Sequence, residues 1–260
     1  TIADSSVELK QTVSNVFEIT FGKATDLGLT GLTVEHVIKG VDAVSKDECL
    51  VKKVTMSEDK KTATVEMFYE FEDGEEYEVT VKGFDTETMT ASNGTPVKAV
   101  LHSDKDDINS RQVLIGTESP IYFKLYDANG VQVESGSTTE DLQNADIEYS
   151  IKYANTDYEN AGSTLFFNEA GDRAVVTLTY HTWNYNNETA EEIGAFTSSP
   201  FTFVAVNKAN VVVKSVKDYA VNSEYWRGAS KNVVKMRQAD KWLEVKLVLT
   251  DNLDKELVFN

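Results

Sequence analysis

The sequence has few of the residues on which disulfides, metal sites and catalytic sites depend. Its 260 residues include one cysteine, Cys49, and three histidines. A single cysteine excludes an intrachain disulfide, on which small eukaryotic secreted modules usually rely. The composition therefore favours a bacterial or phage protein, or an intracellular one. Cys49 is predicted to behave as a small buried hydrophobic residue.

Basic residues and long apolar runs are also scarce. Lysine and arginine total 25 against 43 aspartates and glutamates, which gives a formal net charge of −18. Because phosphate binding needs clustered basic residues, such a surface repels nucleic acid and anionic lipid, and it favours divalent cations and basic partners. No apolar run approaches the length of a membrane-spanning helix. The sequence thus predicts no nucleic-acid partner and no membrane span.

None of the common catalytic or phosphate-binding motifs occurs in the sequence. It contains no G-x-S-x-G, H-E-x-x-H, C-x-x-C or P-loop pattern. His36, His102 and His181 each stand alone in a strand-like run, with no second histidine or cysteine at metal-ligand spacing. Each is interpreted as a strand residue whose ring is solvated or locally hydrogen-bonded. We therefore predict that the chain is not an enzyme.

Alternation of apolar and polar residues with a period of two dominates the chain instead. In the first third it marks the segments Val7–Val13, Val16–Phe21, Leu32–Val37, Leu50–Met56, Thr62–Phe71 and Glu76–Phe84. Polar turns separate these segments, and Gly74 in one of them is free to adopt a positive φ angle. This spacing of short strands predicts an all-β chain made of tandem immunoglobulin-like antiparallel β-sandwich domains.

Breaks in the pattern divide the chain into three predicted domains. The Asn-Gly pair and the proline of "TASNGTP" (Thr90–Pro96) form the first break. Beyond it, a hairpin is predicted over Pro120–Ser135, with its turn at Asn129-Gly130, and a second one over Ser163–Trp183. We predict sandwich domains over residues 1–95 and 96–207, and a partial or small third domain over residues 208–260.

An acidic loop follows the first predicted domain. The stretch "SDKDDINS" offers the oxygen ligands Asp104, Asp106, Asp107 and Asn109. Calcium takes six to eight such oxygens, and a bound ion would stiffen a junction between tandem modules. The spacing is not that of an EF-hand, because the glycine and the glutamate of that loop are missing. The stretch is therefore predicted either to bind Ca²⁺ or to be a solvated acidic loop, and no other cofactor is expected.

An aromatic group stands out in "YHTWNYNN". Tyr180, Trp183 and Tyr185 are followed there by amide side chains. Aromatic rings combined with amides suit a platform on which sugar rings stack. Tryptophan and tyrosine also often lie half buried at the end of a strand, where they cap the core. A glycan-binding platform and a core cap are both open interpretations of these residues.

Three pieces of the first predicted domain resemble the bacterial immunoglobulin-like repeats of surface-layer proteins. They are "VFEITFGKATD" (Val16–Asp26), "VKKVTMSEDKKTATVEM" (Val51–Met67) and "FEDGEEYEVTVKGFDTE" (Phe71–Glu87). The resemblance covers Ser5–Gly94. The second predicted domain is more loosely similar to the group-2 bacterial immunoglobulin-like repeat, through "DANG" and "AGDRAVVTLTY". Cys49 and the loop "TDLGLTGL" depart from the repeat pattern.

The resemblance implies a structural segment of a secreted protein on the bacterial cell surface. Such a segment coats the cell and assembles with copies of itself in a lattice, or with other cell-surface components. The departures keep open an adhesin, or a phage structural or accessory module, that binds glycans or a host receptor. A non-catalytic accessory region of a secreted hydrolase is a third hypothesis. Because the chain begins with Thr1, it is interpreted as a processed product or an excised piece.

Overall fold

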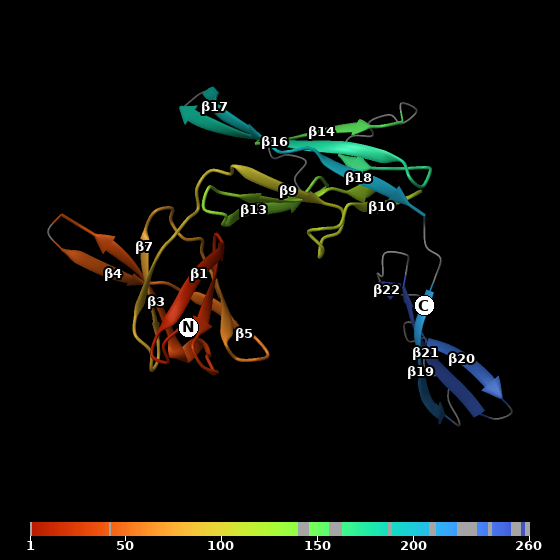
Figure 1. Ribbon diagram of the computed structural model, residues 1–260, viewed down its shortest axis with the longest axis horizontal. Helices are drawn as coiled ribbons and strands as arrows, with labels where there is room; N and C mark the ends of the chain where they lie inside the picture. Colours follow the sequence, from red (N-terminus) through yellow and green to blue (C-terminus); the bar gives the residue numbers. More distant parts are fainter. Residues whose placement is uncertain are drawn as a thin grey trace. The chain divides into compact units, whose positions relative to one another are not determined.

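The fold is described from a computed structural model of residues 1–260. The structure describes all of these residues except 1, 42, 140–145, 156–162, 187–188, 208–211, 223–232, 239–240, 251–255 and 258–260. Strands dominate the described residues (Figure 1). The helical element among them is a single 3₁₀ turn, η1 (Leu29–Gly31). The predicted all-β class is therefore confirmed. No helix of the described residues is long and apolar enough to cross a membrane.

The chain divides into two compact units, each built from separated segments. The first unit contains Thr1–His102, Tyr122–Ser150 and Thr177–Pro200, and the second contains Ser103–Ile121, Ile151–Val176 and Phe201–Asn260. The three domains proposed from the sequence, with boundaries at residues 95 and 207, stay a prediction.

A seven-stranded sheet runs through the first unit in the order β5-β6-β2-β1-β13-β12-β9. Its strands are β1 (Val7–Val13), β2 (Val16–Phe21), β5 (Val51–Met56), β6 (Thr62–Met67), β9 (Lys98–His102), β12 (Tyr122–Tyr126) and β13 (Gln132–Ser137). Neighbouring strands are antiparallel, except that β1 and β13 pair in parallel through Val13 and Gln132. One continuous sheet thus joins strands from both sides of the predicted break at Thr90–Pro96.

A second sheet of the first unit packs against the β1–β2–β6 part of this sheet. It has the order β4-β3-β7-β8 and consists of β3 (Leu32–Lys39), β4 (Val44–Glu48), β7 (Glu76–Val81) and β8 (Glu87–Thr90). Alternate side chains of both sheets meet in one buried core, to which β2 contributes Phe17 and Ile19 and the facing sheet contributes Val34 and Val79. Period-two burial therefore builds a β-sandwich here, as the sequence predicts.

The second hairpin predicted from the sequence, over Ser163–Trp183, is wrong. Its first arm is reduced to β15 (Thr164–Leu165), which pairs with β11 (Ser119–Pro120). Its second arm is the start of the long strand β16 (Arg173–Asn186), and there β16 pairs with β18 (Phe201–Val206). Because β18 occupies that edge of β16, the residues before the turn pair elsewhere.

The remaining strands complete the two units. In the first unit, β17 (Thr189–Thr197) pairs with the last part of β16. β14 (Ile147–Tyr153) has residues in both units. The second unit adds a parallel pair between β10 (Gln112–Leu114) and β18. It also holds a sheet in the order β19-β21-β20, with β22 paired to β21, made of β19 (Val212–Asn222), β20 (Val233–Gln238), β21 (Lys241–Thr250) and β22 (Glu256–Leu257).

Candidate functional site

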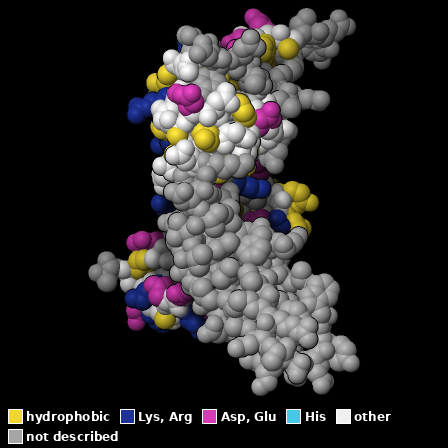
Figure 2. Space-filling model, turned by 90° about the vertical axis from the view of Figure 1, so that its right-hand side faces the viewer, with side chains coloured by type: hydrophobic (Ala, Val, Ile, Leu, Met, Phe, Trp, Pro, Cys, Tyr) yellow, Lys and Arg dark blue, Asp and Glu magenta, His cyan; other side chains and the backbone are white. Residues whose placement is uncertain are grey.

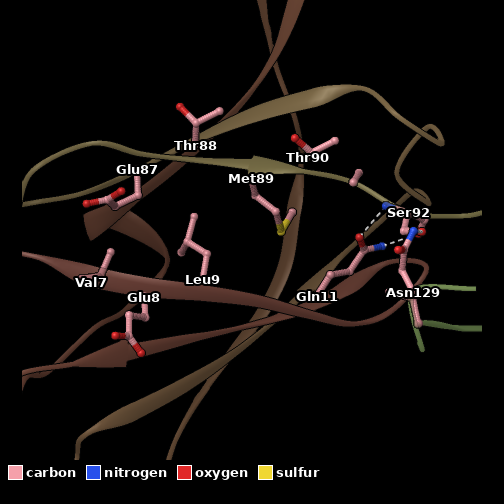
Figure 3. Close-up of a pocket in the computed structure, with 12 residues that line it drawn as sticks. Val7, Glu8, Leu9, Gln11, Glu87, Thr88, Met89, Thr90, Ser92 and Asn129 are labelled. Atoms are coloured by element: carbon pink, nitrogen blue, oxygen red, sulfur yellow. Dashed lines mark hydrogen bonds between the residues drawn. The ribbon is translucent and has the colours of Figure 1, made fainter. Parts of the chain in front are cut away.

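A groove of about 730 Å³ lies in the first unit between β1 of the seven-stranded sheet and β8, the last strand of the second sheet (Figure 3). Its walls are β1 and β8, and residues of the β12–β13 hairpin close one end. The lining residues are Val7, Glu8, Leu9, Gln11, Glu87, Thr88, Met89, Thr90, Ala91, Ser92, Asn129 and Val131. The charged groups in this lining are the carboxylates of Glu8 and Glu87. The lining contains no serine–histidine or cysteine–histidine pair that could support nucleophilic catalysis.

At one end of the groove, the side chain of Gln11 holds the backbone of Ser92. The Gln11 amide donates to the Ser92 carbonyl at 2.8 Å, and the Ser92 N–H donates to Gln11 Oε1 at 2.8 Å. Figure 3 shows both side chains at this end of the groove. This reciprocal pair reproduces the hydrogen bonding of a β-bridge, and it fixes the chain as it leaves β8.

Asp127, in the turn between β12 and β13, holds the same segment from another direction. The residue is 4% exposed, and its carboxylate accepts hydrogen bonds from the hydroxyl of Ser92 and from the N–H groups of Asn129 and Val131, the last two at 2.9 Å. The N–H of Gly94 lies 3.4 Å from the same carboxylate. The Asn129 amide donates to the Ser92 hydroxyl at 2.8 Å. A turn that the sequence predicts as a local reversal thus also binds a distant segment.

The ionisation of Asp127 reflects these contacts. Burial alone raises the pKa of this carboxyl group, because it disfavours the charged form. The hydrogen bonds from Ser92, Val131, Gly94 and Asn129 favour the charged form, and together they outweigh burial. The pKa of Asp127 therefore lies below its ordinary value, and the group is a carboxylate at neutral pH.

Asn93 ties the segment to a third part of the unit. Its N–H donates to Asp73 Oδ1 at 2.8 Å, and its side-chain amide donates to the carbonyl of Phe71 at 3.2 Å and to Glu70 at 3.3 Å. Glu70 in turn accepts a hydrogen bond from the Ser14 hydroxyl at 3.0 Å. We call the group Gln11, Ser92, Asn93, Asp127 and Asn129 the clasp. The clasp holds part of the stretch Thr90–Pro96, which the sequence indicated only as a break in the strand pattern.

In the acidic loop proposed as a calcium site, two of the carboxylate oxygens accept hydrogen bonds from N–H groups of the loop itself. Asp104 Oδ1 accepts the N–H of Asp106 at 3.0 Å, and Asp107 Oδ1 accepts the N–H of Asn109 at 2.9 Å. Asp104 and Asp107 also form an isolated β-bridge. Among the described residues, no group of three or more histidine, cysteine, aspartate or glutamate side chains is arranged to hold a metal ion. Calcium binding by this loop stays a prediction.

The three aromatic residues proposed as a glycan platform all lie on β16, next to β17. Tyr180 pairs with Phe196, Trp183 with Glu192 and Tyr185 with Ala190. Alternation along the strand puts Tyr180 on the opposite face from Trp183. The ring of Trp183 contacts His181, with 5.9 Å between ring centroids. The structure therefore does not bring Tyr180 and Trp183 together on one face, and the side chain of Tyr185 lies outside the described residues.

The histidines and the cysteine occupy strand or strand-end positions. The ring of His36 stacks on Tyr77, and that of His102 stacks on Tyr122. His181 lies between two carboxylates, 3.4 Å from Glu148 and 3.3 Å from Glu192. Cys49 is partly buried and packs against the core of the first unit. On the face drawn in Figure 2, the acidic side chains of the described residues are scattered among basic and apolar ones.

Comparisons with known proteins found a curated relative and several solved structures. No protein-family profile matches the chain. The S-layer protein sap of Bacillus anthracis is 26% identical to it over 219 residues, which amount to 84% of this chain and 25% of that protein. The chain is similar to a bacterial surface-layer protein. This match confirms the resemblance stated from the sequence, although the chain spans only about a quarter of that surface-layer relative.

Two solved structures of surface-layer proteins are also similar to the chain. They are the N-terminal part of the bacterial S-layer protein SbsC and the S-layer protein rSbsC(31-844), each 18% identical with a TM-score of 0.37. The first match covers 77% of this chain and 44% of that one, and the second covers 97% of this chain and 33% of that one.

Proposed function

We propose that the chain is a structural, non-catalytic segment of a surface-layer-type protein, exported to the bacterial cell surface. There it coats the cell and assembles with copies of itself. The observation that carries the proposal is the match to an S-layer protein over 84% of this chain. The β-sandwich of the first unit supports it, because paired strands transmit force between the ends of a module.

The clasp supports a mechanical role in particular. A loop that joins strands is normally the most mobile part of a β-protein. Here Ser92 and Asn93 are held by Gln11, Asp127 and Asp73, through side-chain hydrogen bonds of 2.5 to 2.8 Å. A segment held on several sides keeps its conformation under load. This is the property that a coat built from repeated modules needs.

Immunogold electron microscopy tests the proposed location. Antibodies raised against the purified chain are applied to intact cells that produce the protein, and to cells from which the surface coat has been stripped. We expect dense labelling over the outer surface of intact cells and its loss after stripping. Labelling confined to the cell interior would contradict the proposal, because an interior protein cannot form a coat.

Calcium at the acidic loop is a separate part of the proposal. Asp104, Asp106, Asp107 and Asn109 would supply the oxygen ligands, and the acidic net charge of the chain favours such an ion. The melting temperature is measured in Ca²⁺ and in a chelator, for the native chain and for Asp106→Asn with Asp107→Asn. A melting temperature that is higher in Ca²⁺ than in chelator for the native chain, but not for the double variant, supports the site. Equal melting temperatures of the native chain in the two conditions reject it.

The alternative function is an adhesin, or a phage structural or accessory module, that binds glycans or a host receptor. Of the three aromatic residues predicted for such a platform, Trp183 would contribute to its contact surface, whereas Tyr180 lies on the opposite face of β16. A glycan array probed with the native chain and with Trp183→Ala tests this alternative. Binding that the substitution abolishes would favour the adhesin over the coat, and a lack of binding by the native chain rejects it.

A further inference from the structure

An exposed apolar patch lies on the first unit, away from the groove between β1 and β8. It consists of Leu50, Phe68 and Tyr69, whose exposed fractions are 60%, 58% and 75%. The N–H of Phe68 donates to the carbonyl of Leu50 at 3.1 Å, which holds the two segments side by side. Large apolar side chains that gather on a surface commonly mark a site of protein contact.

A pocket of about 310 Å³ opens beside this patch. Its lining residues are His36, Glu48, Cys49, Leu50, Met67, Tyr69, Glu70, Phe71, Glu72 and Tyr77. Leu50 and Tyr69 belong to both the patch and the pocket. Among the deeper lining residues, Phe71 and Tyr77 are each 3% exposed, and their rings meet edge to face with 4.7 Å between centroids. The pocket therefore has aromatic walls in its interior and an apolar rim on one side.

The charged groups of the pocket have one sign. Glu48, Glu70 and Glu72 contribute carboxylates, and no lysine or arginine is among the described lining residues. The Tyr77 hydroxyl accepts the N–H of Glu72 at 3.0 Å, which fixes the backbone that carries this carboxylate. Glu70 is held by Ser14 and by Asn93 of the clasp. Carboxylates attract a guanidinium or ammonium group, and the exposed ring of Tyr69 at the rim offers such a group an aromatic face.

We propose that this pocket and patch form a docking site for a basic segment of a partner protein. An arginine or lysine side chain of the segment enters the pocket beside the carboxylates and the exposed ring of Tyr69. The apolar neighbours of that side chain cover Leu50, Phe68 and Tyr69. The rim distinguishes this occupant from a free cation, because a small cation would leave the patch exposed.

The net charge of the chain favours a basic occupant of this site. A basic segment is attracted to the surface of a chain with a formal charge of −18. A basic partner therefore pairs with the carboxylates of the pocket and is attracted by the negative net charge of the molecule. The docking site does not depend on the proposed lattice contacts, so an experiment can reject one of these two proposals without rejecting the other.

Cys49 provides a reporter within the pocket, because it is the one cysteine of the chain. The rate of its alkylation by iodoacetamide is measured in the full chain at one fixed pH, since burial raises the pKa of its thiol. The probe is the peptide acetyl-Gly-Leu-Arg-Leu-Gly-amide, and the matched control replaces arginine by citrulline, which has the same shape without charge. Calorimetry with the same peptides gives their affinities.

We expect the arginine peptide to slow alkylation of Cys49 and to bind about tenfold more tightly than the citrulline peptide, with an affinity that falls as salt is added. Replacing Glu48→Gln and Glu72→Gln together should remove this preference. Glu58→Gln, which changes an exposed glutamate in the β5–β6 turn, should keep it. Tyr69→Ala should weaken both peptides, because it removes part of the rim.

Three results would overturn the proposal. The first is equal binding of the two peptides, or no binding of either one. The second is a preference for arginine that survives in the double glutamine variant while its melting temperature is unchanged. The third is a concentration-dependent dimer in analytical ultracentrifugation that Tyr69→Ala abolishes, which would assign the patch to a second copy of the chain.

Discussion

Asp127 is the residue on which most of the clasp depends. Its position at the start of a hairpin turn is common for aspartate, because the carboxylate accepts an N–H two residues later. The Asn129 N–H occupies that role here, at 2.9 Å from Asp127. The same carboxylate also accepts the Ser92 hydroxyl, which belongs to a segment 35 positions earlier in the sequence. A substitution at Asp127 therefore disturbs both the turn and the clasp.

Replacing Asp127 by asparagine should lower the free energy of unfolding by about 2 kcal/mol. The amide keeps the shape of the side chain and one acceptor oxygen, but its NH₂ group replaces the oxygen that accepts the Ser92 hydroxyl and faces the Gly94 N–H, so buried hydrogen bonds are lost. Urea unfolding followed by circular dichroism measures the change. Asp85→Asn is the matched control, because Asp85 is exposed, and it should change stability by less than about 0.5 kcal/mol. Equal effects of the two substitutions would show that the clasp contributes nothing to stability.

The contribution of Asp127 should depend on pH in a defined direction. Its pKa is lowered in the folded protein, so the folded state favours the carboxylate more than the unfolded chain does. The stabilisation is therefore fully present above the ordinary aspartate pKa of about 4, and it is lost as the pH falls through the lower folded value. The difference in stability between the native chain and Asp127→Asn should shrink below about pH 4. A difference that grows on acidification would contradict this assignment.

At the level of strands and turns, the alternating segments were predictable from the sequence and the exposed ones were not. β1 and β2 begin and end at the predicted residues, because apolar side chains recur at alternate positions along them, with Gln11 as the polar exception in β1. β4 was missed, since all five of its residues are exposed and it carries no apolar pattern. β6 ends at Met67, whereas Phe71, predicted as its last residue, lies in the following loop.

Gly74 and Gly28 allow a sharp test of the turn between β6 and β7. Both glycines are exposed, and a methyl group added to either one meets no atom within 4 Å. Gly74 has a φ of +79°, whereas Gly28 has a φ of −120°. Gly74→Ala should therefore cost about 1 kcal/mol of stability through backbone strain alone, and Gly28→Ala should be neutral or slightly stabilising. Thermal unfolding measures both variants, and a neutral Gly74→Ala would refute the left-handed turn.

The clasp could be only partly predicted from the sequence. The turn chemistry of "DANG" and the break at "TASNGTP" are local signals, and both were visible. The two segments lie far apart in the sequence, and no periodic pattern relates the residues that join them. The reciprocal amide pair of Gln11 and Ser92 spans 81 positions. Side-chain contacts of this kind follow from the tertiary packing of β1 beside β8, and no local rule indicates them.

At the level of the whole molecule, the surface-layer resemblance rests on the same pieces that build the first sandwich. The alternating strands and their turns gave the all-β class and pointed to the class of relative that the comparison then found. The proposed ligand sites were less predictable, because they depend on which strand face each side chain occupies. Tyr180 and Trp183 are near in sequence, yet the strand places them on opposite faces.

The structural role is tested most directly by negative-stain electron microscopy of the purified chain, concentrated stepwise in Ca²⁺ and in a chelator. We predict ordered sheets or tubes with a regular repeat, which appear above a threshold concentration and disperse on dilution. Single particles at every concentration, in both conditions, would contradict the proposed self-assembly.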